Sequence, residues 1–252
     1  MPDYFSNTAD YLDVSYRYLL LEKQEGILKL TLNRPEKRNA FSPLMIHELA
    51  YAMEGANNDE EIRAVQLEAA PPVFCAGMDL KIFRGEVQEA IPEKFKAEGL
   101  TMALALRQLD KPLIAIVEGP VIAGGFLILN ECHMVLARED VWFRLPEIEI
   151  GIFPFQVMEK LPEIVGERTA LDWALTGKKV TADEALSSGL VNRVFKKETK
   201  GEILQETLSG IKNADVKLLN AAISTLRKLK TIPESDRAVE LKKVLDQFSG
   251  QK

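Results

Sequence analysis

One stretch of this chain, residues 117–137, could do chemistry with its backbone. It reads VEGPVIAGGFLILNECHMVLA, in which a strand end and a Glu-Gly-Pro turn precede the pair Gly124-Gly125 and an apolar segment. If that segment is helical, it is apolar on nearly every face and therefore buried. Glycines at its start let a ligand approach the backbone, and the N–H groups of a helix's first turn suit a developing oxyanion. The same letters also fit a tight turn whose glycines serve packing alone.

The sequence contains few histidine and cysteine side chains that could act in catalysis or bind a metal. The histidines are His47 and His133, without an acid–histidine cluster, which argues against zinc chemistry and a Ser–His–Asp triad. His47 lies within a helical pattern and is interpreted as solvated rather than catalytic. Cys75 and Cys132 each sit in an apolar stretch, which is typical of reduced core cysteines in an intracellular protein.

Composition limits the partners. The 252 residues, 46% hydrophobic and 28% charged, fit one large α/β domain, or one domain with a helical appendage. The net charge of -6 is spread along the chain, which argues against nucleic acid because binding it needs a concentrated basic face. No apolar run is long enough to span a membrane, and the N-terminal residues lack the order of a signal peptide. We therefore expect a cytoplasmic location and no membrane partner.

Strands and helices alternate irregularly through the first two thirds of the sequence, which predicts an α/β core with a helical tail. A hairpin is expected over residues 15–33, followed by a helix that begins at Pro43 with Ser42 as its N-cap. Further strands are expected at AVQLEAA, LIAIV, VWF and LVNRVF, and further helices at VGERTALDWALTG, TADEALSSGL and the last fifty residues.

Five segments in this order resemble the crotonase superfamily, the enoyl-CoA hydratases and isomerases. They are LNRPEKRNAFS, FCAGMDL, KPLIAIVEGPVIAGG, LPEIEIGIFP and LTGKKVTADEALSSGLVNRV. The resemblance covers roughly residues 17–195. It implies a spiral core of repeated strand–strand–helix turns over residues 1–195, a C-terminal helical region over residues 196–252, and a homotrimer or hexamer. It also implies acyl-CoA thioester substrates, with no metal and no cofactor apart from the coenzyme A of the substrate.

The resemblance also implies which residues act. The N–H groups of Ala76 and Gly124 would form the oxyanion hole, and preorganised backbone donors suit that task. Hydratases of the family carry two glutamates, but here Leu127 occupies the first position and Glu147 the second. Water addition needs two acid–base groups, whereas a double-bond shift needs a single carboxylate. This pattern, and the loop GIFPF, resemble the 3,2-enoyl-CoA isomerases of the family.

Some positions depart from the family pattern. Gly119 follows Glu118 where the family usually has Asn. Met78 stands in place of a small residue and His133 in place of Asp, and Phe155 occupies the position of an extra Asp in dienoyl isomerases. Glu131 could replace the missing acid, but it also fits a buried glutamate paired with His133 or another base.

Other residues are expected around the substrate. Glu149 is a secondary acid candidate or a salt-bridged side chain. Lys37 and Arg38 either pair with the phosphates of coenzyme A or form a solvated loop. Phe74, Leu127 and Phe155 are expected to contact the substrate.

Several functions stay open on these residues. The first is an isomerase that moves a double bond with Glu147 as its single base. The same oxyanion hole would also serve a weak hydratase or a decarboxylase. A non-catalytic acyl-CoA-binding homologue is the alternative from another class, and the presence of Glu147 argues against it.

Overall fold

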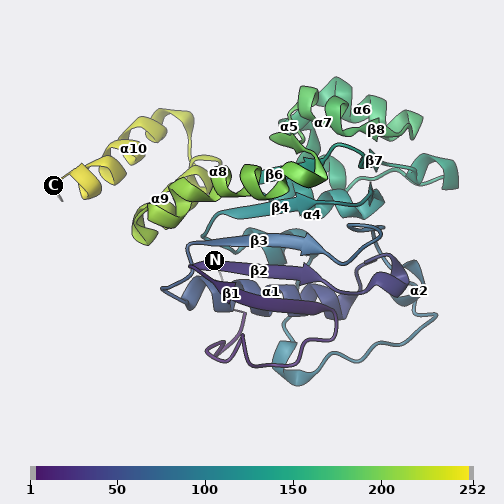
Figure 1. Cartoon of the computed structure of the whole chain (residues 1–252), viewed down its shortest axis with the longest axis horizontal. Helices are drawn as coiled ribbons and strands as arrows, with labels where there is room; N and C mark the ends of the chain where they lie inside the picture. Colours follow the sequence, from purple (N-terminus) through teal and green to yellow (C-terminus); the bar gives the residue numbers. More distant parts are fainter. Residues whose placement is uncertain (1–3, 250–252) are drawn as a thin grey trace.

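The computed structural model describes residues 4–249. A six-stranded sheet has the order β1-β2-β3-β4-β6-β9, and a smaller sheet has the order β5-β7-β8. The strands of the large sheet are β1 (Leu19–Gln24), β2 (Ile27–Leu32), β3 (Ala64–Ala69), β4 (Leu113–Val117), β6 (Met134–Arg138) and β9 (Arg193–Phe195). The strands of the small sheet are β5 (Val121–Ile122), β7 (Trp142–Arg144) and β8 (Val180–Thr181). Figure 1 shows the stacked strands of the large sheet, with β1 and β2 at one edge.

The predicted hairpin is confirmed. β1 and β2 pair antiparallel, and Gln24 opposite Ile27 leaves a two-residue turn. Both turn residues, Glu25 and Gly26, have positive φ angles, of 49° and 76°, as the turns favoured by the twist of a hairpin require. From β2 onward the large sheet is parallel, so its carboxyl ends meet at one edge.

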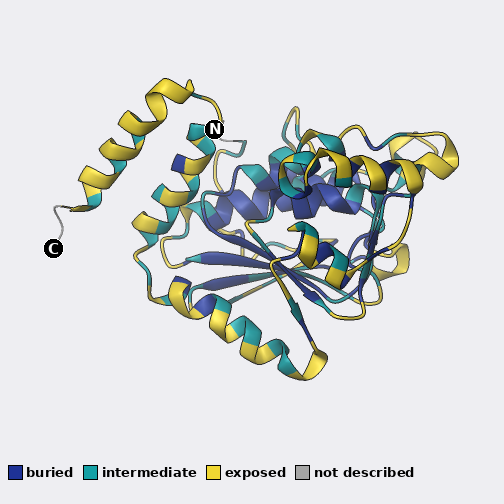
Figure 2. Cartoon of the chain, turned by 90° about the horizontal axis from the view of Figure 1, so that it is seen from above, coloured by how far each residue is buried: buried dark blue, intermediate teal, exposed yellow. Residues whose placement is uncertain are grey.

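Helices cover the large sheet and extend beyond it. Helix α1 (Pro43–Asn58) begins as predicted, because the Ser42 hydroxyl accepts the Met45 N–H at 3.3 Å and Pro43 is the first helical residue. The other helices are α2 (Leu80–Phe83), α3 (Met102–Arg107), α4 (Phe126–Glu131), α5 (Leu161–Val165), α6 (Glu167–Thr176), α7 (Ala182–Ser188), α8 (Lys200–Asn213), α9 (Val216–Leu229) and α10 (Glu234–Ser249). Figure 2 shows burial concentrated in the strands and the helices against them, and α10 largely exposed.

The apolar segment after the glycine pair is only partly helical, which corrects the expectation of one buried helix. Helix α4 ends at Glu131, and β6 begins at Met134. Met134 pairs with Ile114 of β4 in the middle of the sheet. A buried helix and a central strand both need apolar residues on all sides, so hydrophobicity alone cannot separate them.

The C-terminal region follows β9 and contains only helices among the described residues. Leu208 and Ile211 of α8 are buried against Ile27, Ile114 and other residues of the large sheet, so α8 is part of the core. The division at residue 195 stays a prediction. Among residues 4–249, no helix is long and apolar enough to cross a membrane.

Candidate active site

The glycine turn of residues 123–125 packs backbone to backbone against residues 75–78. A Cβ on Gly125 would lie 2.8 Å from the Cys75 carbonyl oxygen, and one on Gly77 would lie 3.0 Å from the Gly124 nitrogen. Gly77 also has a φ of 90°, a conformation that side chains rarely adopt. These two glycines are therefore needed for the close approach that brings the two turns together.

Close packing of the backbone also explains why position 119 is a glycine. A Cβ at this position would lie 2.6 Å from the Pro72 carbonyl oxygen and 2.9 Å from the Phe74 nitrogen. Residues 72–74, which lead into the turn of residues 75–78, pass very close to position 119, just after β4. Only glycine fits there without a shift. Packing thus explains the glycine at this position.

The N–H of Ala76 is already used. It donates a hydrogen bond to the Arg38 carbonyl oxygen at 3.0 Å, which contradicts its prediction as an oxyanion donor. On either side of Met78, the Phe41 N–H donates to the Gly77 carbonyl and the Phe41 carbonyl accepts from the Asp79 N–H, each at 2.8 Å. Met78 lies between these two bonds in a parallel bridge, so its own N–H points away from Phe41.

A buried ion pair holds this turn in place. The Asp79 carboxylate lies 2.8 Å from Nη2 of Arg34, and both side chains are largely buried. The Asn39 side chain, which is fully buried, accepts from the Arg34 N–H and donates to the Ala70 and Val73 carbonyls. Sequence reasoning missed Arg34 and Asn39, although both lie in a segment that carries the resemblance.

A cavity of about 170 Å³ opens beside Met78, and we call it the acyl cavity. Its lining is mostly apolar: Phe41, Ile46, Met78, Phe83, Leu100, Thr101, Met102, Ala103, Leu127, Gln156 and Glu159. Leu127, one of the residues expected to contact the substrate, thus lines this cavity. Phe74 does not, because its side chain is buried in the core. Phe155 is 76% exposed and packs edge-to-face on Phe153 instead of lining the cavity.

Glu147 and the glycine turn follow two paired strands of the small sheet. Ile122 of β5 pairs in parallel with Arg144 of β7. The glycine turn begins one residue after Ile122, and the short helix η4 (Glu147–Ile150) begins three residues after Arg144. Two segments far apart in the sequence thus leave the same edge of one sheet.

The Glu147 side chain is partly buried, and among the described residues its Oε2 atom is buried without a hydrogen-bond partner. Burial raises the pKa of this carboxyl group, and a hydrogen bond from its own N–H opposes the shift. The loop that follows contributes less cover than expected, because Ile150 and Phe155 are well exposed. A poorly solvated carboxylate with one unpartnered oxygen can accept a proton.

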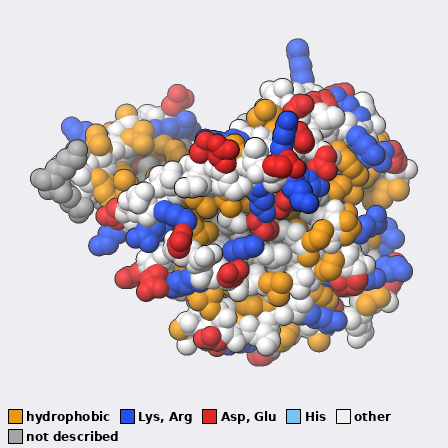
Figure 3. All heavy atoms as spheres, viewed as in Figure 1, with side chains coloured by type: hydrophobic (Ala, Val, Ile, Leu, Met, Phe, Trp, Pro, Cys, Tyr) orange, Lys and Arg blue, Asp and Glu red, His pale blue; other side chains and the backbone are white. Residues whose placement is uncertain are grey.

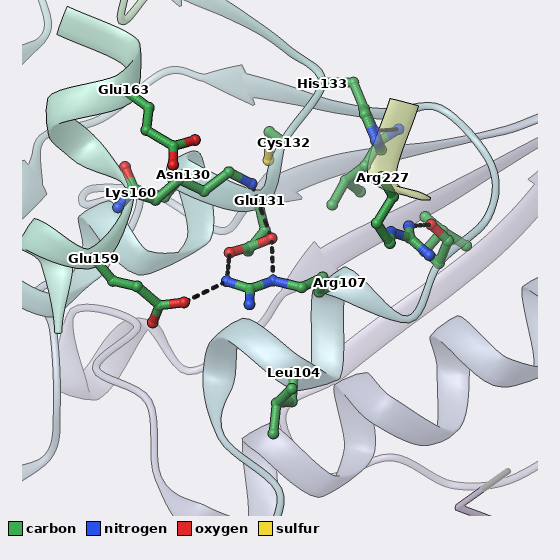
Figure 4. Close-up of polar contacts among 12 residues, drawn as sticks. Leu104, Arg107, Asn130, Glu131, Cys132, His133, Glu159, Lys160, Glu163 and Arg227 are labelled. Atoms are coloured by element: carbon green, nitrogen blue, oxygen red, sulfur yellow. Dashed lines mark hydrogen bonds and ion pairs between the residues drawn. The ribbon is translucent and has the colours of Figure 1, made fainter. Parts of the chain in front are cut away.

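The other two acid candidates are engaged elsewhere, and Figure 4 shows the contacts of Glu131. Glu131, whose side chain is 3% exposed, contacts Arg107 at 2.7 Å and Lys160 at 3.0 Å. Glu131 is therefore a buried, paired glutamate. Its partners are Arg107 and Lys160 and not His133. Glu149 forms an ion pair with Arg144. Neither Glu147 nor Glu149 is among the residues that line the acyl cavity.

The basic pair Lys37 and Arg38 is exposed at the end of the short helix η1 (Pro35–Lys37). Arg38 has a φ of 53°, and its carbonyl holds Ala76, so the pair is tied to the turn of residues 75–78. Its place at the surface beside that turn suits a phosphate-bearing part of a substrate.

His133 has a structural task. Its Nδ1 atom accepts the Leu113 N–H at 2.9 Å, and partial burial and the charges of Arg227 and Lys160 lower the pKa of its imidazole. We expect His133→Asp to keep the melting temperature, since a carboxylate can accept the same hydrogen bond beside these two cations. His133→Leu should lower stability by about 1–3 kcal/mol because the Leu113 N–H loses its acceptor. Equal thermal melts for the two variants would contradict this role.

The comparisons with known proteins agree with this geometry. The sequence model of the enoyl-CoA hydratase/isomerase family matches residues 22–248. The chain belongs to that family. Among curated relatives, it is 32% identical to enoyl-CoA hydratase EchA19 of Mycobacterium tuberculosis over 230 residues, which are 86% of this chain and 83% of the relative.

Other relatives carry other activities. The chain is 35% identical to hydroxycinnamoyl-CoA hydratase-lyase of Pseudomonas fluorescens, with 70% of this chain and 66% of the relative covered. It is 30% identical to the human mitochondrial Delta(3,5)-Delta(2,4)-dienoyl-CoA isomerase, with 73% of this chain and 60% of the relative covered.

The solved structures confirm the crotonase fold. The structure of AtuE of Pseudomonas aeruginosa superposes with a TM-score of 0.79 at 32% identity and covers 93% of this chain and 91% of that one. A probable enoyl-CoA hydratase/isomerase from Mycobacterium abscessus superposes with a TM-score of 0.82 at 26% identity, over 94% and 92% of the two chains. The family and the fold are therefore shown, and the chain is an enzyme of this family.

Proposed function

We propose that this enzyme shifts a double bond, converting 3-enoyl-CoA to 2-enoyl-CoA, with Glu147 as its only general base. One observation carries the proposal. Glu147, which follows the same small sheet as the glycine turn, supplies a carboxylate with an unpartnered oxygen, whereas Leu127 lines the acyl cavity where a hydratase would need a second acid. The other glutamates near the site, Glu131, Glu149 and Glu159, are held in ion pairs.

In the reaction that we propose, the thioester oxygen is held by two backbone N–H groups. Gly124 is one donor, since the second residue of the short helix η3 (Ala123–Gly125) has no acceptor within its helix. The second donor becomes Met78, because the N–H of Ala76 is committed to Arg38. Donors fixed in this way need no reorganisation when charge develops on the oxygen.

Glu147 then moves one proton. Its carboxylate takes the proton from C2 of the 3-enoyl thioester, and the electron pair is delocalised over the dienolate and its oxygen. The same carboxyl group returns the proton at C4, so the double bond ends between C2 and C3 and Glu147 is ionised again. The net change requires neither water nor a metal or redox cofactor, and the absence of a cofactor stays a prediction.

Leu127 offers the test of isomerase against hydratase. We expect Leu127→Glu to add measurable hydration of 2-enoyl-CoA, because it supplies the second acid–base group beside the cavity. The buried carboxyl should also lower stability by several kcal/mol. Product analysis by chromatography separates 3-hydroxyacyl-CoA from the two enoyl isomers. Leu127→Gln, of the same size without an acid, is the matched control and should not hydrate.

Strong hydration by the unsubstituted enzyme would instead support the hydratase alternative, with another residue as second acid. Acyl-CoA binding without any turnover would support the non-catalytic alternative. The trimer or hexamer implied by the family and the cytoplasmic location stay predictions, and sedimentation of the purified enzyme tests the first of them.

A further inference from the structure

A second cavity lies behind the acyl cavity. It has a volume of about 350 Å³, and we call it the charged cavity. Its walls come from α3, α4, the segment of residues 159–163 and α9: Leu106, Arg107, Glu131, His133, Glu159, Lys160, Glu163, Ile223, Leu226, Arg227, Lys230 and Thr231. Within residues 4–249, Glu159 is the one residue that lines both cavities. The two spaces therefore meet at a single side chain.

Glu159 is held there by Arg107 (Figure 4). Nη2 of Arg107 lies 3.1 Å from Oε1 of Glu159. The same guanidinium makes two hydrogen bonds to Glu131, at 2.7 and 3.2 Å. Lys160 adds a third contact to Glu131. Arg107 is thus anchored on a buried carboxylate and presents one remaining contact to Glu159.

The two halves of this network differ in strength. The Glu131 side chain is 3% exposed, and its charge-assisted bonds are of the strong kind. The Glu159 side chain is 61% exposed and has one bond to the guanidinium, and exposed ion pairs contribute little to stability. Glu159 can therefore be replaced without removing what holds α3 to α4.

The charged cavity is less polar than its name suggests. Leu106, Ile223 and Leu226 contribute apolar side chains. The cations have carboxylate partners: Arg107 and Lys160 with Glu131, Arg227 with Asp110, and Lys230 with Glu163. The stems of such long side chains form apolar surface while their charged ends face water. An alkyl chain that passed Glu159 would find room and apolar contact there.

We propose that Glu159, held by Arg107, sets the acyl chain length that the enzyme accepts by closing the acyl cavity toward the charged cavity. The proposal rests on the acyl-CoA site proposed above. With the Glu159 side chain in place, the acyl cavity of about 170 Å³ is smaller than most small-molecule sites, which suits a short acyl group. Without it, we expect the charged cavity of about 350 Å³ to become accessible from the site.

Equilibrium binding of saturated butanoyl-, octanoyl- and dodecanoyl-CoA, measured by calorimetry, tests this directly. For Glu159→Ala, the affinity for dodecanoyl-CoA relative to butanoyl-CoA should rise at least about 10-fold over the native ratio. Each methylene moved from water into apolar surroundings is worth roughly a factor of four in affinity. Glu159→Gln keeps the length of the side chain and should stay within about three-fold of the native ratio, since the effect is one of space.

Glu206→Ala is the matched control. It removes a carboxylate from another exposed ion pair, with Arg193 at 2.8 Å, and Glu206 lines neither cavity. Its ratio of affinities should equal the native one. Circular dichroism and thermal melts of all variants show that each is folded before its binding is compared.

Saturated thioesters undergo no double-bond shift, so the outcome does not depend on isomerase activity. A ratio for Glu159→Ala equal to the native one would overturn the role of Glu159 and leave the isomerase proposal standing. Native enzyme that gains affinity steadily from butanoyl- to dodecanoyl-CoA would also overturn it, because the cavity would not be closed. If the native enzyme binds none of the three, both proposals fail.

Discussion

Glu147→Gln should leave acyl-CoA binding within a few-fold of the native value while kcat falls by roughly 10²–10⁴. The amide keeps the shape and hydrogen bonding of the side chain but cannot accept the C2 proton. Saturated acyl-CoA binding and turnover of 3-enoyl-CoA, measured on the same preparation, separate the two effects. Glu149→Gln is the control, because Glu149 is already paired with Arg144. If Glu149→Gln abolishes turnover and Glu147→Gln does not, the wrong carboxylate has been identified.

The raised pKa of Glu147 sets the sign of two pH effects. The active form is the carboxylate, so kcat/KM should fall as the pH drops through a pKa above the ordinary value for glutamate. Burial disfavours the same charge in the folded state, so above this pKa Glu147 lowers stability and protonation relieves the cost. Glu147→Gln should therefore melt at or above the native temperature near neutral pH. A clear loss of stability would show that the carboxylate has a structural partner.

Gly124→Pro should lower kcat/KM, because proline removes the N–H aimed at the thioester oxygen. The expected loss of transition-state stabilisation is about 3–4 kcal/mol. The backbone before it is special: Ala123 has a φ of 53°, and a residue that precedes proline is itself restricted. Circular dichroism and saturated acyl-CoA binding must therefore accompany the kinetics. Gly124→Ala, which keeps the N–H but places a Cβ 3.1 Å from the Phe41 ring, is the steric control.

If the folded Gly124→Pro enzyme turns over at a near-native rate, Gly124 is not a donor. If Gly124→Ala is as inactive as Gly124→Pro, crowding against Phe41 explains the loss and the missing donor does not. The expected order is a small loss for Gly124→Ala and a large one for Gly124→Pro.

Local signals predicted much of the fold from the sequence. Alternation in β1 and β2, the Ser42 cap and the glycines that end α6 and α7 each act within a few residues. The apolar residues after Gly125 were misread because burial on all sides is shared by α4 and β6. Local hydrophobicity cannot show that the second half of this segment becomes a strand that pairs with β4.

The candidate site was predicted less evenly. Glu147, Gly124 and Leu127 follow from motif spacing, but the choice between Ala76 and Met78 as donor depends on which N–H the Arg38 carbonyl occupies. The acyl cavity also draws on residues that carry no motif, such as Phe41 and Glu159. Their roles come from contacts between segments far apart in the chain. Figure 3 shows charged and apolar side chains intermingled over one face of the molecule.

The most direct test of the central claim is a pair of initial rates. Purified enzyme is given 3-enoyl-CoA and 2-enoyl-CoA of the same short chain length, and all products are separated by chromatography. We predict that 3-enoyl-CoA is converted to 2-enoyl-CoA and that 3-hydroxyacyl-CoA forms from neither substrate at a comparable rate. Formation of 3-hydroxyacyl-CoA as the main product from 2-enoyl-CoA would contradict a single-base isomerase.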